Sequence, residues 1–398
     1  MKTKTARLFF IDAMRAWAIL MMLQGHFIDG LLDPVYRDSE NAVFSIWLYF
    51  RGITAPVFFT VSGFIFTYLL IKVPQKGFEN PRVRKGIRRG LQLLLIGYLL
   101  RMNLLGIFSG EIYDSFYLVD VLHCIGFSIL ALIGIYLFTT NRNKYLFPAI
   151  LLGITFVLFL FEPLYKQWSF SFLPNAIANY FTKTNGSVFT LIPWLGYATI
   201  GGFIAILFHK FKDHKYLYET AIWIALVLGS LLIFTSSDVF LYIHRLTNIQ
   251  LFADIFFNNY LFIRLGDVFL VFAIFMLLRK FMTNKTVLNV GASTLSIYVI
   301  HFVILYGSFT GLGLYRFFNH ILIPSVAIPG ALVFMFTCTF LALRYHKHES
   351  EIMTHIAMGI GQIKNQGVGL INTCKPVLKE VLIRLRLFLT RIFRLAKN

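Results

Sequence analysis

The chain has 398 residues, of which 58% are hydrophobic and only 14% charged, and its formal charge is +19. A soluble domain is about 25% charged. Here long apolar segments run through the whole chain, which excludes a soluble domain with a single anchor. The widely spaced Cys124, Cys338 and Cys374 suggest neither a disulfide framework nor a zinc site. The expected fold class is all-α, a polytopic membrane helix bundle.

Ten segments each contain the ~17 residues that a helix needs to cross a membrane. In chain order they are 8–31, 44–71, 91–109, 116–139, 146–163, 188–208, 216–236, 257–278, 287–308 and 321–343. The N-terminus, the even-to-odd loops and the C-terminal segment hold 28 Lys and Arg, whereas the opposite loops hold five. By the positive-inside rule, both termini are expected in the cytoplasm. The net positive charge is then explained by the basic cytoplasmic loops and tail, so no nucleic-acid partner is expected.

The first span contains the stretch RAWAILMMLQGH, which begins with Arg15 and ends with His26. These two residues are eleven positions apart, so they share a helix face at an axial separation of ~16 Å. Asp12 and Asp29 fall near the same stripe. An arginine in hydrocarbon costs at least ~2.5–3.5 kcal/mol, so this stripe should face the bundle interior. His26 is expected near the outer face and Arg15 in the inner half.

Other spans also carry ionisable residues. They are Arg51 in the second, Arg101 in the third, Asp120 and His123 in the fourth, Arg264 and Asp267 in the eighth, and His301 in the ninth. The three span histidines map to the outer half, together with Asp29 and Asp120. Histidine can accept and return a proton near neutral pH, and arginine suits phosphate or carboxylate. The pattern indicates a polar path with titratable groups toward the outside.

These residues also have structural alternatives. Arg15 could serve only as the ion-pair partner of Asp12, and Arg264 only as that of Asp267. His123 could serve only to hydrogen-bond Asp120 and orient its span, and His301 could be an interhelical histidine whose ring nitrogens are satisfied. The sequence leaves both interpretations open.

Five stretches resemble a known family when they are taken in chain order. They are IDAMRAWAILMMLQGH, ITAPVFFTVSGF, VDVLHCIG, IPWLGYATIGG and STLSIYVIH, and they extend from residue 11 to residue 301. The chain resembles the transmembrane acyltransferase superfamily, in particular bacterial relatives of heparan-α-glucosaminide N-acetyltransferase. The arginine and histidine of the first stretch are also similar to the first helix of the acyltransferase-3 family.

The resemblance implies transfer of an acyl group, usually acetyl, from cytoplasmic acetyl-CoA to a hydroxyl or amine of a glycan on the other side. It implies His26 as general base or transient acetyl carrier, with Asp29 to orient it. The catalytic set is then His26, Asp29, Asp120 and His123, and the set that binds the acyl-CoA is Arg15, Arg51, Arg101 and His301. No metal is expected.

One position departs from the family's pattern. In the animal heparan enzymes the histidine given the catalytic role follows the first span, just before a Trp-Asn-Gly stretch. The matching region here, SIWLYFRG, has no histidine. His26 fills the acyltransferase-3 position instead, so the prediction places the chemistry there.

Two domains are expected, a transmembrane acyltransferase domain over 1–344 and a basic cytoplasmic tail over 345–398. From Pro376 the tail alternates apolar and basic residues with helical period, which predicts a helix on the anionic membrane surface. The resemblance implies a multi-pass protein of the bacterial inner membrane, with acyl-CoA, a glycan or sugar acceptor and membrane lipid as partners, and it leaves a homodimer open. The rival interpretation is a proton-coupled transporter or flippase, although the halves show no repeat of the kind many transporters have.

Overall fold

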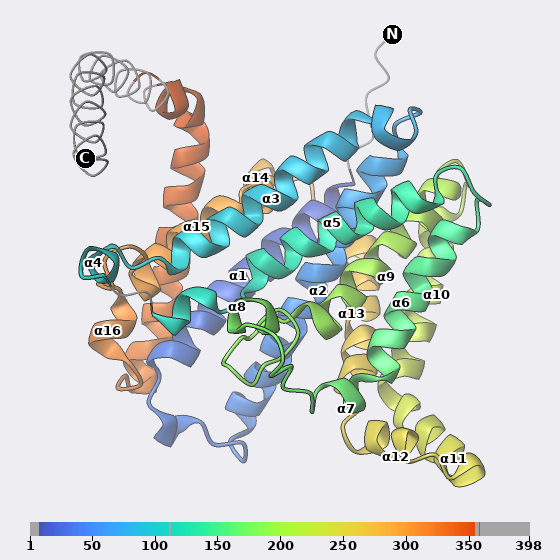
Figure 1. Cartoon of the computed structure of the whole chain (residues 1–398), viewed down its shortest axis with the longest axis horizontal. Helices are drawn as coiled ribbons and strands as arrows, with labels where there is room; N and C mark the ends of the chain where they lie inside the picture. Colours follow the sequence, from blue (N-terminus) through green and yellow to red (C-terminus); the bar gives the residue numbers. More distant parts are fainter. Residues whose placement is uncertain (1–7, 111–112, 355–357, 359–398) are drawn as a thin grey trace, which may run out of the picture. The chain divides into compact units, whose positions relative to one another are not determined.

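The computed structural model describes residues 8–110, 113–354 and 358, and these residues form helices and turns without a named strand. The chain divides into two units, Met1–Leu343 and Arg344–Asn398. The tail helix expected from Pro376 lies outside the described residues. All-α architecture, expected from composition, is confirmed (Figure 1).

The helices follow one another through short loops. They are α1 Phe9–Leu31, α2 Ala42–Ile71, α3 Pro81–Arg101, α4 Leu104–Phe108, α5 Val121–Thr139, α6 Leu146–Leu160, α7 Glu162–Tyr165, α8 Asn175–Ala178, α9 Leu191–Lys210, α10 Leu217–Phe234, α11 Ser236–Thr247, α12 Gln250–Phe257, α13 Tyr260–Leu277, α14 Lys285–Ala292, α15 Thr294–Tyr306 and α16 Leu314–Phe318. A further helix, Pro324–Thr354, follows α16.

A helix covers most of each predicted span. By length and composition, six described helices can cross a membrane, and the pair α14 and α15, bent by 68°, makes a seventh. Three others do not meet the same test: α1 carries the charged and polar stripe, the first half of α3 is basic, and α6 has 15 residues. The chain is a multi-pass membrane protein, and the count of ten spans stays a prediction.

The third span differs from its expected bounds of 91–109. The helix α3 begins ten residues earlier, at Pro81, and ends at Arg101. Asn80 caps it by accepting a hydrogen bond from the backbone N–H of Arg82, and proline suits the first helical turn. Hydropathy alone therefore placed this span too late, because it gives no weight to a basic amphipathic start with a strong cap.

The centre of the bundle is the crossing of α2 and α9. At Gly63 an added Cβ would overlap the backbone of Ala198, and at Gly201 it would overlap the backbone of Thr60. Small residues at such positions let two helix backbones touch. Large buried rings, Phe59, Trp194 and Tyr197 among them, pack beside this crossing, and the crossing fixes where α1 and α2 present their polar faces.

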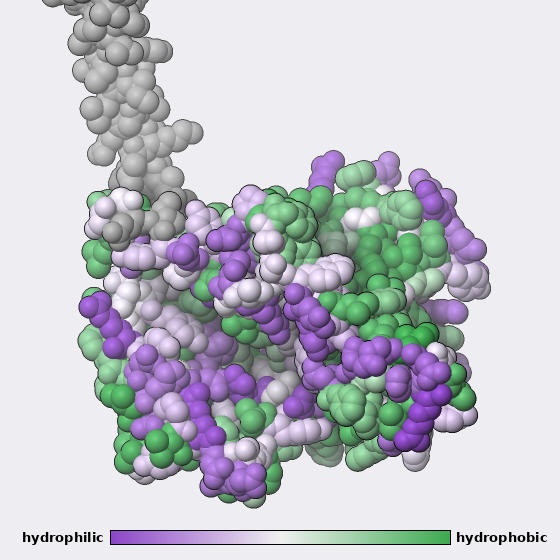
Figure 2. All heavy atoms as spheres, turned by 60° about the horizontal axis from the view of Figure 1, so that its bottom comes forward, coloured by the Kyte–Doolittle hydropathy of each residue, from purple (hydrophilic) through white to green (hydrophobic). Residues whose placement is uncertain are grey.

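The loops alternate between two ends of the bundle. At one end, which we call the outer end after the charge-based prediction, Leu322 exchanges backbone hydrogen bonds with Leu31 and Asp33, and the N–H of Phe309 donates to the carbonyl of Met102. At the opposite end Arg279 pairs with Glu219 at 3.5 Å. Figure 2 turns the bottom of Figure 1 forward and shows many hydrophilic residues across that face, with hydrophobic residues denser at its upper right flank.

Candidate active site

A cavity of about 250 Å³ lies between α1, α2 and the loop that leads into α9. Its lining combines polar and apolar side chains. The polar ones are His26, Asp29, Arg51, Thr54 and Lys183, and the large apolar ones are Met21, Met22, Phe58, Phe59, Phe189 and Trp194. Two residues of the predicted catalytic set, His26 and Asp29, and one residue predicted to bind the acyl-CoA, Arg51, therefore line the same cavity.

The helical spacing of α1 and one glycine, Gly25, build the polar wall of this cavity. Gly25, His26 and Asp29 lie on adjoining positions of one face of α1. The side chain of Arg51 passes over Gly25, where an added Cβ would lie 3.4 Å from its Cγ, and it forms an ion pair with Asp29. The SIWLYFRG stretch, which contains no histidine, thus brings an arginine to the cavity.

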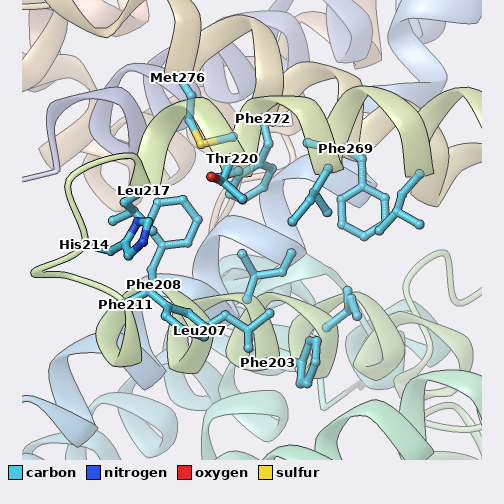
Figure 3. Close-up of a pocket in the computed structure, with 16 residues that line it drawn as sticks. Phe203, Leu207, Phe208, Phe211, His214, Leu217, Thr220, Phe269, Phe272 and Met276 are labelled. Atoms are coloured by element: carbon cyan, nitrogen blue, oxygen red, sulfur yellow. The ribbon is translucent and has the colours of Figure 1, made fainter.

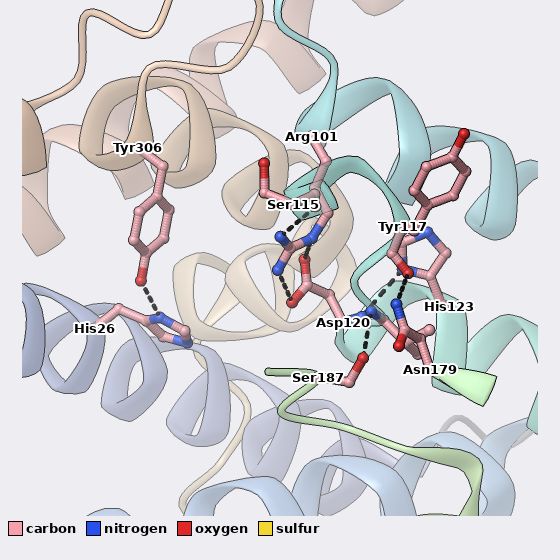
Figure 4. Close-up of polar contacts among 10 residues, drawn as sticks. His26, Arg101, Ser115, Tyr117, Asp120, His123, Asn179, Ser187 and Tyr306 are labelled. Atoms are coloured by element: carbon pink, nitrogen blue, oxygen red, sulfur yellow. Dashed lines mark hydrogen bonds and ion pairs between the residues drawn. The ribbon is translucent and has the colours of Figure 1, made fainter. Parts of the chain in front are cut away.

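Tyr306 holds the ring of His26. The Nδ1 atom of His26 lies 2.8 Å from the hydroxyl oxygen of Tyr306, at the end of α15 (Figure 4). The hydrogen bond at one imidazole nitrogen decides whether the other nitrogen carries a proton. If Nδ1–H donates to Tyr306, then Nε2 is a proton acceptor on the half-buried ring that lines the cavity.

His301 stands behind His26 rather than in the cavity. Its ring is fully buried, with its centroid 5.3 Å from that of His26 and 4.8 Å from that of Tyr298. The nearest polar groups to its ring nitrogens are on the backbone of its own helix, at Ile297 and Tyr298. Both interpretations of His301, an interhelical histidine with satisfied nitrogens and a residue of the site, stay open.

Arg101, Asp120 and His123 form a separate cluster between α3 and α5. Arg101 binds both carboxylate oxygens of Asp120, at 2.5 and 2.7 Å, and donates to the carbonyl of Ser115 at 2.9 Å (Figure 4). The N–H of Asp120 donates to Nδ1 of His123 at 3.1 Å. The His123 ring is fully buried against Gly97 and Tyr98. None of the three charged or titratable groups lines the cavity.

Two other arginines have close carboxylate neighbours. Arg15 lies 3.9 Å from Asp12 and donates to the hydroxyl of Thr294 at 2.8 Å, where α14 bends into α15. Arg264 pairs with Asp267 at 2.9 Å, and Asp267 also accepts from the Tyr49 hydroxyl at 2.6 Å. Arg15 therefore lies on the part of α1 distant from His26, as its position in the sequence predicts.

Two residues of the site were missed by the sequence analysis. Tyr306 lies five residues beyond the STLSIYVIH stretch, and a tyrosine near the end of a span usually indicates only an interfacial anchor. Lys183 is a single lysine in a polar loop, and burial of part of its side chain lowers its pKa. For Lys183 the available signal was the scarcity of basic residues on the outer side.

A second cavity, of about 420 Å³, lies between α9, α10 and α13 (Figure 3). Phe203, Leu207 and Phe208 line it from α9, and Phe269, Phe272 and Met276 line it from α13. No carboxylate, arginine or lysine is among its lining residues, and His214 is its single titratable group. Its composition fits a hydrocarbon chain rather than group transfer, so the α1–α2 cavity is the candidate active site.

A comparison with protein-family models identifies the family of the chain. The family model described as heparan-alpha-glucosaminide N-acetyltransferase, catalytic, matches residues 7–243. The chain belongs to this family. The matched segment includes every residue that lines the α1–α2 cavity and ends before Tyr306 and His301. The resemblance read from the five stretches is thereby confirmed, whereas no curated protein matches the chain.

Proposed function

We propose that this chain transfers an acyl group, in the first place acetyl, from acyl-CoA to a hydroxyl or amine of a sugar at the outer end. The family's name denotes an acetyltransferase. The observation that carries the proposal is the placement of His26, which lines a polar cavity within the bundle while Tyr306 engages its Nδ1. A charged ion pair beside it, Arg51 with Asp29, completes a group suited to acyl transfer.

His26 acts as the general base. With Nδ1–H donating to the Tyr306 oxygen, Nε2 keeps its lone pair and takes the proton from the acceptor hydroxyl or amine as that atom attacks the thioester carbonyl. The new bond joins the acceptor oxygen or nitrogen to the acyl carbon, and the bond from that carbon to the CoA sulfur breaks. The proton on His26 then passes to the leaving thiolate, which leaves as the thiol of CoA.

Arg51 and Asp29 define the electrostatics of this step. As negative charge develops on the thioester oxygen, a guanidinium held in place beside the cavity stabilises it without the reorganisation that water requires. Asp29 holds Arg51 and keeps it from turning away. Arg15, farther along α1, is assigned to the phosphates or the pantetheine arm of the donor, because arginine recognises phosphate in two-point fashion.

The test measures acetyl-CoA binding and slow acetyl-CoA hydrolysis by purified protein in detergent. We expect wild type to bind and hydrolyse, Arg15→Ala to bind more weakly, and His26→Ala to bind normally without turnover. His348→Ala is the matched control, because His348 is exposed in the second unit and pairs there with Glu351.

The opposite result would replace the proposal. Folded wild-type protein that binds neither acetyl-CoA nor CoA would contradict acyl transfer. Uptake of a sugar by proteoliposomes driven by a proton gradient would then favour the transporter interpretation.

A further inference from the structure

A long apolar groove runs along α1 on the face next to the active-site cavity. Its volume is about 580 Å³, more than twice that of the cavity. The floor is α1, and the two walls are the first turns of α2 and the helix Pro324–Thr354. The α1 residues on the floor recur every three or four positions, from Trp17 through Gln24 to Leu32.

The groove is long enough to cross the hydrocarbon of one membrane leaflet, and its lining is mostly apolar. From Trp17 to Leu32 the α1 axis advances ~22 Å, and the hydrocarbon of one leaflet is about 15 Å thick. Asn41 and Tyr36 lie at its outer end, and the wall from Pro324 down to Met335 is apolar apart from its backbone. A chain molecule in this groove would have its polar end at the outer end of the bundle.

The groove is a slot rather than a flat face. Its floor and inner wall are buried, as at Ile28, Leu32 and Ala331. Its rims are exposed, as at Val43 and Leu332. A helix from a second copy would need a broad exposed face, whereas a slot with a buried floor and exposed rims accommodates one flexible chain.

The groove and the cavity share a wall. Met21 lines both, and the first turns of α2 separate them. The indole N–H of Trp47 donates to the side-chain oxygen of Gln24 at 2.6 Å, and Trp47 lies one turn before Arg51. Along the α1 axis, the outer end of the groove, at Leu32, is within two helical turns of His26, which faces the cavity on another side of the helix.

From this arrangement we propose that the groove binds the hydrocarbon chain of the acceptor, so that the acceptor is a lipid-linked sugar rather than a free one. The inference rests on the proposed acyl transfer and names its substrate class. The chain enters from the leaflet between α2 and the helix Pro324–Thr354. Its sugar headgroup then lies at the outer end of the groove, next to the cavity that contains His26 and Arg51.

The experiment compares acceptors that differ only in their chain. Protein in nanodiscs receives labelled acetyl-CoA and a series of n-alkyl glucosaminides from hexyl to hexadecyl, with acceptor concentrations corrected for partition into the bilayer. We expect KM to fall by about tenfold or more across the series, because each added methylene is buried in the slot. Free glucosamine should be acetylated slowly or not at all.

Two neighbouring substitutions assign the effect to the groove. Leu332 lines it and is 57% exposed, while Val333 is 65% exposed and does not line it. Leu332→Trp should abolish the dependence on chain length, and Val333→Trp should leave it unchanged. Displaceable binding of a tritiated hexadecyl glucosaminide to the same variants gives a readout that needs no turnover.

Each outcome decides between occupants. A KM independent of chain length, or a dependence that survives Leu332→Trp, overturns the proposal and assigns the groove to ordinary membrane lipid. A change of oligomeric state in Leu332→Trp, with transfer intact, assigns it to a second copy. If acetyl-CoA is neither bound nor hydrolysed, acyl transfer itself fails, and the tritiated-lipid binding still tests the groove.

Discussion

Two clusters in this bundle use the same kinds of residues and differ in what they can do. In one, His26 stands beside Arg51 and Asp29 in a cavity of about 250 Å³. In the other, the ring of His123 is enclosed by the α3 backbone, and Arg101 takes both oxygens of Asp120. The residue types alone therefore do not distinguish the two clusters, whereas the presence of a cavity does. The first cluster lines a cavity, whereas the second connects α3 to the residue before α5.

The sharpest test of this difference is a pair of histidine substitutions. His26→Ala should lower acetyl transfer by about 10²–10⁴-fold, the usual contribution of a general base, with donor binding retained. His123→Ala should cost stability while turnover per folded molecule stays near wild type. Steady-state transfer rates normalised by a folded-fraction assay measure both. Equal losses of turnover in the two variants would end the distinction between the clusters.

Breaking the second cluster's ion pair should mainly destabilise the protein. Asp120→Asn removes the charge that Arg101 binds while both side chains are shielded from solvent. Removing one partner of a buried pair costs about 3–5 kcal/mol, and we expect a clearly lower thermal midpoint in detergent. Asp114→Asn, in the exposed loop before α5, is the control. A normal midpoint combined with lost turnover would move Asp120 into the active site.

Tyr306→Phe tests how His26 is held. The substitution keeps the ring and removes the hydroxyl 2.8 Å from Nδ1, which should lower kcat by about tenfold, the equivalent of one hydrogen bond to a charged ring. The acidic limb of the pH–rate profile should shift, because the hydroxyl oxygen accepts a hydrogen bond from Nδ1–H and so stabilises the protonated ring of His26. Tyr315→Phe is the control, because Tyr315 contacts the ring of Tyr306 and the structure describes no hydrogen bond from it to His26; this variant should behave as wild type. An unchanged pH profile in Tyr306→Phe would reduce Tyr306 to packing.

The smallest effect is expected at Lys183. Its side chain adds positive charge to the outer part of the cavity. Lys183→Met should therefore raise the KM for the acceptor by a few-fold and leave kcat unchanged. Because part of this side chain reaches solvent, the difference should shrink at high salt. Lys166→Met, in the same outer segment but outside the cavity lining, is the control. A fall in kcat instead would make Lys183 part of the chemical step.

The sequence predicted part of the candidate site, His26 and Asp29 on one helix face, but it did not predict the contact with Tyr306. Helical period alone placed His26 and Asp29 on one face, because residues three apart are about one turn of α-helix apart. It also paired Arg264 with Asp267 correctly. It grouped Asp120 and His123 with the outer histidines, which they accompany in depth without lining the same cavity. The roles assigned to Arg101, Asp120, His123 and His301 remain predictions.

By itself the sequence determined that this is a multi-pass helical protein, that it belongs to the family named after heparan-α-glucosaminide N-acetyltransferase, and which face of α1 is polar. Those features depend on the composition of the chain, the order of its motifs and the helical period of single segments, and none of these requires contacts between helices. Only the tertiary structure decided that Tyr306 reaches His26 across 280 residues of chain, that Arg51 rather than Arg101 lines the cavity, and that a groove adjoins it. These are contacts between helices, and they are set by which backbones touch, as at Gly63 and Gly201, not by the pattern along any one helix.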